Sequence, residues 1–381
     1  MQVPLIKQAA TAATILLALS AHAQTTLRVA SAGSQNMVDY VRTYLAPKFE
    51  ATHPGVNVQV FGTGPGDAGS QKIYEKLEAQ KQSGRQHWDI DVAVVHQKLG
   101  GEMVEKGLLK SYRNDISNGK LVSRDSAKNA LGVNVNGYVM PMFHSQTAIA
   151  YNSDLIKNPP KSYNQLVKWV KKHPKAFGYN GIKNGMSGVS FVTGWIYAYG
   201  SSAKTLTTKP YNPQLKNGWR QAYQKLKSFN QYVTFTPGNA GTLDMLNRGE
   251  IFMGPVWVDM FYSWKDAGKL PPSLKLTLIA PGMPGQPMYY VIPAKASHQK
   301  LAEEFINLAT SPKVQAEGIV KRFNWYPGID AKYVKSQMDA ASWNKLFKEI
   351  SPHDLATKGK SFPLGAYLDD IKEGYERQVN N

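Results

Sequence analysis

Cysteine is absent from this chain of 381 residues. Disulfide bonds, Fe–S clusters, thiolate metal sites and cysteine nucleophiles are therefore excluded. Beyond the N-terminus, no segment approaches the ~18 consecutive apolar residues that a membrane-spanning helix needs. Carboxylates are missing from one long stretch, because no Asp or Glu occurs between residues 155 and 243. With no internal repeat and no low-complexity tract, the sequence predicts ordinary globular domains.

The stretch without carboxylates is rich in positive charge, with Lys or Arg at thirteen positions from Lys157 to Lys227. The formal net charge of the whole chain is +18. A block of this kind typically forms a solvated face, which is the simplest interpretation. Alternatively, it draws anionic solutes toward a nearby cleft or docks on an acidic surface.

The signatures of common enzyme classes are missing as well. The stretches GMSGV and GVSFV place the second glycine wrongly for the nucleophile turn G-x-S-x-G. There is no H-E-x-x-H, EF-hand or P-loop signature, and the eight histidines form no pair at ligand spacing. We therefore predict a protein with no enzymatic activity, no metal site and no cofactor.

The N-terminus, MQVPLIKQAATAATILLALSAHAQ, has the pattern of an export signal. A lysine precedes an apolar run from Ala9 to Leu19, and Ala-His-Ala at 21–23 matches a small-x-small cleavage site. This predicts a signal peptide over residues 1–23 and a mature chain from Gln24. A retained membrane anchor is the alternative, but the apolar run is too short to span a bilayer.

Export without a lipid-bearing cysteine suits the periplasm of a Gram-negative bacterium. Nucleic acid, the usual partner of so basic a chain, is then not expected.

The remaining ~358 residues are enough for two domains with full cores. Strand and helix patterns alternate from Thr26 to Arg113, which predicts parallel strands covered by helices. After this, two short strands are predicted, from Tyr138 and from Thr147.

A strand beginning at Met288 is followed by helices, which is the same strand–helix pattern as in residues 26–113. Two α/β lobes are therefore interleaved, with crossings expected near 143–147 and 287–290, and a cleft between the lobes is the expected ligand site.

Five segments of the sequence also carry a resemblance to a known family. They are LRVASAG with HPGVNVQV, DIDVAVVHQKLGGEMVEKGLLKSY, MPMFHSQTAIAYNSDLIKNPPKSYNQLVKW, FMGPVWVD, and MYYVIPAKASHQKLAEEFINLATSP.

In their order and spacing, these segments resemble the bacterial extracellular solute-binding proteins of family 1, the soluble receptors of ABC importers. The stretch KKHPKAFGYNGIKNGMSGVSF is closer to the thiamine, iron and YnjB-type branch than to the maltose receptors. The resemblance implies an α/β fold of two interleaved lobes joined by hinge strands, as in type II periplasmic binding proteins. It also implies a small-molecule solute captured by lobe closure and an inner-membrane ABC permease as partner. We expect a monomer.

The lobes are expected at 24–144 with 289–326 (lobe 1) and at 145–288 (lobe 2). Helices in 327–381 are expected to pack on lobe 2.

One glycine-rich turn raises a rival function, since Gly64, Gly66 and Gly69 have the spacing G-x-G-x-x-G of dinucleotide-binding folds. The turn follows the second strand of the mature chain, and Asp67 within it would repel a pyrophosphate. A structural turn with Asp67 or Ser70 as helix N-cap, or a contact to a solute, explains it better.

Ligands of α/β sheets meet the carboxyl ends of strands and the amino ends of helices. Each candidate there also has a plain structural interpretation, as a turn, hinge or core residue. The polar candidates near these ends are Gly33, Ser34, Gln35, Asp67, His96, Gln97, His144, Ser145 and Gln146. Ser187, Gly188 and Ser190 form a helix start that could hold a carboxylate or phosphate through backbone N–H groups and hydroxyls.

Aromatic residues at loop-rich junctions offer a different kind of site. Trp257, Trp325 and Tyr326 could stack on a sugar or cage a cation, and Asp259 could pair with a cationic solute. The basic stretch and the serine-rich helix start favour an anionic solute, phosphorylated or carboxylated. Thiamine, a polyamine, a sugar or ferric iron remain alternatives, as does a secreted hydrolase or a partner-binding subunit on the same fold.

Overall fold

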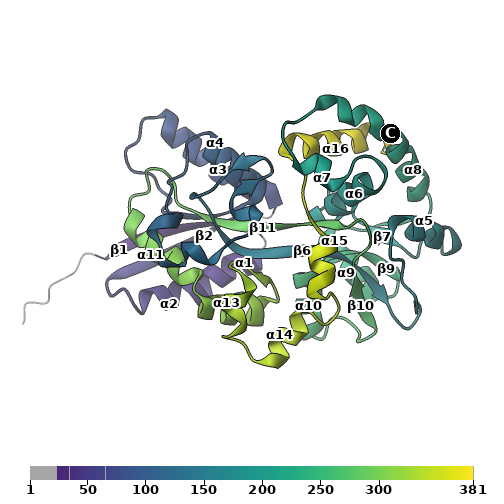
Figure 1. Cartoon of the computed structure of the whole chain (residues 1–381). Helices are drawn as coiled ribbons and strands as arrows, with labels where there is room; N and C mark the ends of the chain where they lie inside the picture. The colour runs from purple at the N-terminus through teal and green to yellow at the C-terminus, as the bar shows by residue number, and fades with distance from the viewer. Residues whose placement is uncertain (1–23, 34, 65, 381) are drawn as a thin grey trace, which may run out of the picture.

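A computed structural model describes residues 24–33, 35–64 and 66–380 (Figure 1). Its main sheet has the strand order β10-β6-β11-β3-β1-β2, with β9 and β12 paired to β6 and β13 to β11. The strands are β1 Thr25–Ala32, β2 Val56–Gly64, β3 Val92–His96, β6 Met140–Asn152, β9 Met253–Trp257, β10 Leu274–Thr277, β11 Met283–Val291, β12 Tyr326–Pro327 and β13 Gly359–Ser361. β1 pairs in parallel with both β2 and β3, as the alternating pattern predicts.

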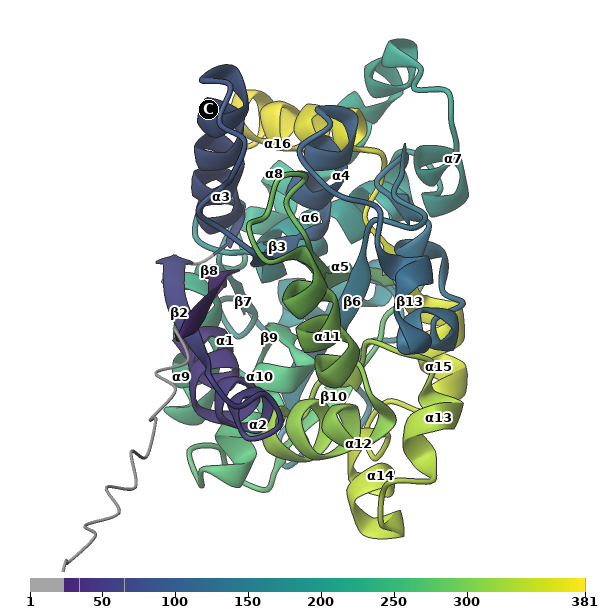
Figure 2. The same cartoon turned by 90° about the vertical axis from the view of Figure 1, so that its left-hand side faces the viewer.

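Helices cover both faces of this first part of the sheet (Figure 2). They are α1 Gln35–Tyr40, the π-helical η1 Val41–Leu45, α2 Ala46–Glu50, α3 Gly66–Gln82, α4 Gln97–Glu105 and α11 Gln299–Ala309. Between α4 and β6 lie η2 Arg113–Asp115, η3 Ser117–Leu121, η4 Asp125–Ala127 and the hairpin β4 Asn129–Ala130 with β5 Val133–Asn134. The first helical stretch stops where expected, just before Gly55, which has φ +86°.

β6 and β11 run across the molecule and belong to both of its halves (Figure 1). β6 pairs with β11 and β12 up to Gln146, and from Thr147 onward with β9 and β10. The prediction of two short strands here was wrong, because β6 is one strand of 13 residues. The strand continues without a turn, and most of its side chains are buried in the core.

The second half holds a separate aromatic core that includes Tyr163, Phe191, Trp195 and Phe229. Trp195 and Tyr197 are both buried there. The elements of this half are α5 Tyr163–Lys172, β7 Gly178–Tyr179, α6 Met186–Tyr199, α7 Ala203–Thr207, η5 Pro213–Trp219, α8 Arg220–Asn230, β8 Thr234–Phe235, α9 Gly238–Asn247 and α10 Val258–Asp266.

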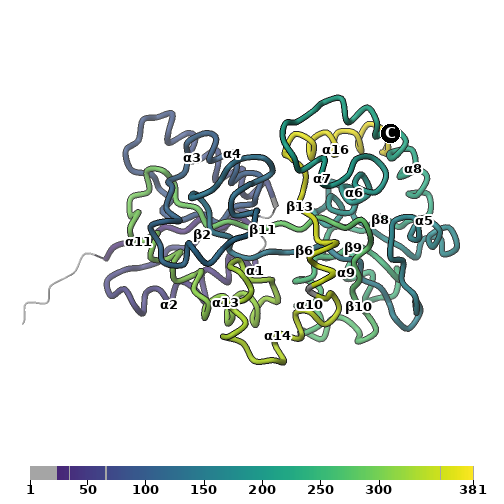
Figure 3. The backbone as a smooth tube through the Cα atoms, viewed as in Figure 1, coloured from purple at the N-terminus to yellow at the C-terminus, as the bar shows by residue number. Residues whose placement is uncertain are grey.

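The C-terminal segment divides between the two halves (Figure 3). Its elements are α12 Pro312–Val314, η6 Gln315–Lys321, α13 Ala331–Lys335, α14 Ala340–Leu346, α15 Pro352–Lys358 and α16 Gly365–Gln378. α16 contacts α6 and α8, whereas α13 and α14 contact η6. The apolar side chains Val334 of α13 and Leu346 of α14 join a hydrophobic core that extends from the first half into α9, α10 and β10, so these two helices do not pack on lobe 2 alone. Within the described residues, no helix is long and apolar enough to cross a membrane.

Candidate ligand-binding site

The carboxyl ends of β1, β2 and β3 lie at the same edge of the sheet, because these strands are parallel. The amino ends of α1, α3 and α4 begin directly after them. Gln35 is exposed at the start of α1 and donates a hydrogen bond to Asp39 Oδ1 at 2.8 Å. Ser34, another candidate contact, lies outside the described residues.

The glycine-rich turn is needed for close packing. Gly64 has φ +108°, and a Cβ added at Gly69 would stand 1.9 Å from the carbonyl oxygen of Gly64. Asp67 and Ser70 lie inside α3, so the prediction that one of them is its N-cap was wrong. Ser70 is fully buried and joins α3 to β3: its Oγ accepts a hydrogen bond from the backbone N–H of His96 at 2.9 Å.

His96 and Gln97 form the junction of β3 and α4, and both are buried. His96 Nδ1 lies 3.0 Å from Ser70 Oγ. Burial lowers the pKa of His96, and the negative charge of Asp67 opposes this only partly. The imidazole is therefore neutral near pH 7, suited to hydrogen bonding rather than to pairing with an anion.

Neighbouring hinge residues on β6 point to different partners. Gln146 Nε2 donates to the carbonyl oxygen of Met283 at 2.8 Å. Gln146 Oε1 and His144 Nδ1 are buried, and neither has a hydrogen-bond partner among the described residues. Burial and the positive charge of Arg124 lower the pKa of His144 to about 3. Ser145 instead donates a short hydrogen bond to Asp259 Oδ1 at the start of α10.

Asp259 carries a buried carboxylate, with the residue only 7% exposed. Burial raises its pKa, while the Ser145 hydroxyl, the nearby indole N–H of Trp325 and the first backbone N–H groups of α10 oppose the shift. Among the described residues, no Lys, Arg or His side chain lies within ion-pair distance of this carboxylate. Trp257, the residue before α10, is 7% exposed beside it. The pair predicted from the sequence, Trp257 and Asp259, is thus brought to the hinge.

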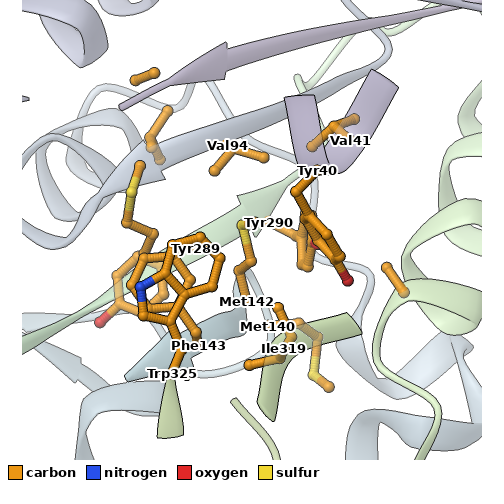
Figure 4. Close-up of a cluster of buried hydrophobic side chains, with 14 of the residues drawn as sticks. Tyr40, Val41, Val94, Met140, Met142, Phe143, Tyr289, Tyr290, Ile319 and Trp325 are labelled. Atoms are coloured by element: carbon orange, nitrogen blue, oxygen red, sulfur yellow. The ribbon is translucent and has the colours of Figure 1, made fainter. Parts of the chain in front are cut away.

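Trp325 and Tyr326 occupy the core beneath the hinge, not an open loop. Trp325 is 1% exposed and stacks between Phe143, at 4.1 Å between ring centroids, and Phe323, at 4.9 Å. Figure 4 shows its ring lying over Phe143. The indole N–H lowers the pKa of Asp259, yet it has no partner of normal hydrogen-bond geometry. The Tyr326 hydroxyl is likewise buried without a hydrogen-bond partner among the described residues.

Three further tyrosines with buried, unpartnered hydroxyls surround this region, namely Tyr40, Tyr262 and Tyr290. Tyr40 lies edge-on to Trp325 and close to Tyr290 (Figure 4). Sequence reasoning did not select them, because tyrosine is also common in a hydrophobic core. Nothing local in segments such as MYYVIP distinguishes a tyrosine whose hydroxyl lacks a partner from one whose hydroxyl is bonded.

The serine-rich start of α6 is closely packed inside the protein. Ser187 Oγ donates to Asn239 Oδ1 at 2.7 Å, and the same amide oxygen accepts from the Ser187 backbone N–H at 3.2 Å. Ser190 Oγ donates to the Pro284 carbonyl at 2.8 Å. A Cβ at Gly188 would stand 1.7 Å from the carbonyl oxygen of Gly181. These groups already have partners, so an anion would have to displace them.

Metal coordination has little support in this arrangement. No group of three or more His, Asp or Glu side chains within the described ranges is placed to hold a metal ion.

A family model described as "bacterial extracellular solute-binding protein" matches residues 45–367 of this chain. The chain belongs to this family. It is a solute-binding receptor of an ABC transporter, and its relatives bind solutes rather than transform them. The family is extracellular, in agreement with the predicted location. A sequence search of curated proteins gave no match.

Solved structures share the two-lobed α/β fold of this receptor, which confirms the predicted fold class. Maltose-bound MalE3 of T. maritima is 13% identical, with a TM-score of 0.69 over 93% of this chain and 95% of that one. A solute-binding protein of Thermotoga lettingae bound with α-D-tagatose is 16% identical, with a TM-score of 0.68 over 93% and 94%. The TpPotD lipoprotein of Treponema pallidum is 16% identical, with a TM-score of 0.67 over 93% and 100%.

Proposed function

We propose that this receptor is periplasmic and captures a small solute bearing a cationic group, with Asp259 as the counter-charge. The observation that carries the proposal is the buried carboxylate of Asp259, which has no cationic partner among the described residues. A buried charge is costly unless it is paired and hydrogen-bonded. Ser145 and the amino end of α10 supply hydrogen bonds and a favourable dipole but no full positive charge.

The surroundings of the carboxylate also suit a cation. The face of an indole or phenol ring attracts positive charge, most strongly where water is excluded. Trp257 adjoins Asp259 along the chain, and Tyr326 lies near the carboxylate. Trp325 also lies near it, but the faces of its indole are covered by Phe143 and Phe323. An amino group beside Asp259 would pair with the carboxylate while its carbon skeleton lies against Trp257 and Tyr326.

Elements of both lobes meet here. Asp259 belongs to α10, which lies with β9 in the second half, whereas Tyr40 and Tyr290 belong to α1 and to the first-lobe part of β11. A solute bound to one set would therefore favour the closed arrangement that brings the other set to it. The closed receptor, as a monomer, would then dock on its ABC permease.

An anionic solute, predicted from the basic stretch 155–243, is the second candidate. The favourable observation is the charge of that stretch, which contains no carboxylate. Against it, the hydroxyls of Ser187 and Ser190 are engaged by Asn239 and Pro284. Thiamine, a polyamine or an amino acid fits the Asp259 site better than a phosphate does, because each carries positive charge.

The test is a thermal-shift screen confirmed by titration calorimetry. Protein from Gln24 onward, freed of solute by unfolding and refolding, is screened against polyamines, thiamine, amino acids, sugars, organic phosphates, carboxylates and iron chelates. A solute at a thousand times its Kd adds about 4 kcal/mol to the free energy of unfolding, enough for a clear shift. We expect hits among cationic and zwitterionic solutes only.

Two variants sharpen the result. Asp259→Asn keeps the shape and should lower affinity at least tenfold, whereas Asp154→Asn, at an exposed carboxylate, should leave affinity unchanged. Hits restricted to phosphates or neutral sugars, or equal affinity of the Asp259→Asn variant, would refute the cationic assignment.

A further inference from the structure

A concave site lies on the outer end of the molecule, away from the hinge. Its volume is about 660 Å³. It is lined by Tyr151, Lys157, Asn158, Pro159, Pro160, Lys161, Gln165 and Trp169, and we call it the α5 pocket. α5 stands at the end of the second half farthest from β1 and β2 (Figure 1), so the α5 pocket is separate from Asp259.

The walls of the α5 pocket have two different characters. Gln165 and Trp169 are four residues apart on one face of α5. Lys161 precedes the helix, and its backbone N–H donates to Gln165 Oε1 at 2.7 Å. The rings of Tyr151, Pro159 and Pro160 supply apolar surface, and Lys157 adds a second positive charge. Leu155, nearby in the chain, is 57% exposed, so an apolar side chain also lies at the surface here.

The positive charge of the α5 pocket is not neutralised by the protein's own carboxylates. Lys157 Nζ donates to the Ser153 carbonyl at 3.1 Å and Lys161 Nζ to Thr277 Oγ1 at 3.3 Å, and neither forms an ion pair within the described residues. Elsewhere in the basic stretch, α16 provides such partners: Asp370 pairs with Lys216 at 2.8 Å.

We propose that the α5 pocket is a docking site for an acidic peptide segment of a partner protein, with carboxylates at Lys157 and Lys161 and an apolar side chain against Trp169. Charge complementarity selects an anionic partner. The rings of Tyr151, Pro159, Pro160 and Trp169 favour a peptide, whose apolar side chains can lie against them while its carboxylates meet the lysines. A single small anion would leave most of the volume and all of the rings unused.

This docking site does not depend on which solute the receptor carries, so it is tested without any solute. The probe is the peptide acetyl-Glu-Glu-Phe-Glu-amide with a fluorescent label, and the matched peptide with Gln in place of Glu is the control. Anisotropy titrations are run at low ionic strength and at 0.3 M salt, where the Debye length has roughly halved relative to 0.1 M. We expect binding of the Glu peptide that weakens with salt and little binding of the Gln peptide.

Variants then locate the binding. Lys157→Gln with Lys161→Gln should weaken binding of the Glu peptide at least tenfold. The matched pair Lys120→Gln with Lys128→Gln removes the same charge from exposed positions of the first half and should change binding less than twofold. Trp169→Ala tests the apolar wall and should weaken binding severalfold. Circular dichroism of each variant verifies that the fold is kept.

Several outcomes would overturn the proposal. They are the absence of binding to the unmodified protein, equal binding of the Gln peptide, and equal losses in the two lysine pairs, which would indicate diffuse charge. Vesicles of phosphatidylglycerol serve as a further probe. If they bind through Lys157 and Lys161 while the peptide does not, the surface recognises a membrane and the peptide proposal is wrong.

Discussion

Replacing Trp325 by alanine should separate a core role from a role in contacting solute. The sequence predicted a solute contact at this position, whereas the structure stacks the indole between Phe143 and Phe323 with 1% exposure. Phe143 lies on the hinge strand β6, and Phe323 follows η6. Removing the ring would therefore leave a cavity where the hinge packs on the first lobe.

The size of the effect follows from burial and stacking. Truncating a buried Trp to Ala costs about 3–5 kcal/mol through lost transfer energy and the cavity. Aromatic pairs add about 0.5–1.5 kcal/mol beyond their buried area, which places the expected loss of stability at the upper end of the range for a buried Trp. At roughly 2 °C per kcal/mol for a chain of this size, Tm should fall by about 10 °C.

Differential scanning calorimetry of solute-free protein measures the fall directly. Trp343→Ala is the matched control: Trp343 is only half-buried and stacks on a single ring, Phe347, at 5.1 Å. Its Tm should fall by less than half as much. A Trp325→Ala variant with nearly unchanged Tm and complete loss of solute binding would refute the core assignment and restore Trp325 as a solute contact.

Three further predictions rest on single contacts. Because the pKa of His144 is about 3 when folded and about 6.5 when unfolded, the unfolded state takes up the proton first. Stability should fall by a few kcal/mol from pH 6.5 to 3, and urea titrations should show His144→Gln flattening this slope. The ion pair of Lys98 with Asp369, at 2.8 Å, joins α4 to α16 but is partly exposed, so a double-mutant cycle of unfolding should give only about 0.5 kcal/mol, less in salt. Ser190→Ala removes one of two hydroxyls that donate to the buried Pro284 carbonyl, the other being Thr147 Oγ1 at 2.6 Å, and should cost about 0.5–1.5 kcal/mol in the same titrations without changing solute affinity; an affinity loss would support the anionic site.

Much of the fold could be read from the sequence, because its elements repeat with regular periods. β1, β2 and β3 are short apolar runs closed by turn residues, and the helices between them show apolar spacing. β6 was divided wrongly because its polar residues, Ser145 and its neighbours, look like a turn. Those residues are tolerated in mid-strand because Asp259 and other distant groups hydrogen-bond them, and sequence order does not reveal such partners.

The site was harder to predict, since its groups come from segments far apart in the chain. Trp257 was selected as an aromatic residue at a loop-rich junction, and Asp259 as the carboxylate two residues later; the structure puts Trp257 at the end of β9 and Asp259 in α10, and their contact with a solute stays a prediction. Ser187 and Ser190 were selected as hydroxyls at a helix start, yet Asn239, some fifty residues away, occupies that start. Whether a hydroxyl is free for a solute depends on long-range packing that local patterns do not encode.

The place of β11 in the sheet has a consequence for biosynthesis. β11 lies between β3 and β6, so the first lobe lacks a middle strand until residue 291 has been made. The N-terminal part cannot complete its core while the chain is still growing, which delays stable folding. The sequence predicts export, and for an exported chain this order of synthesis would keep the leading segment from folding stably until most of the polypeptide has emerged.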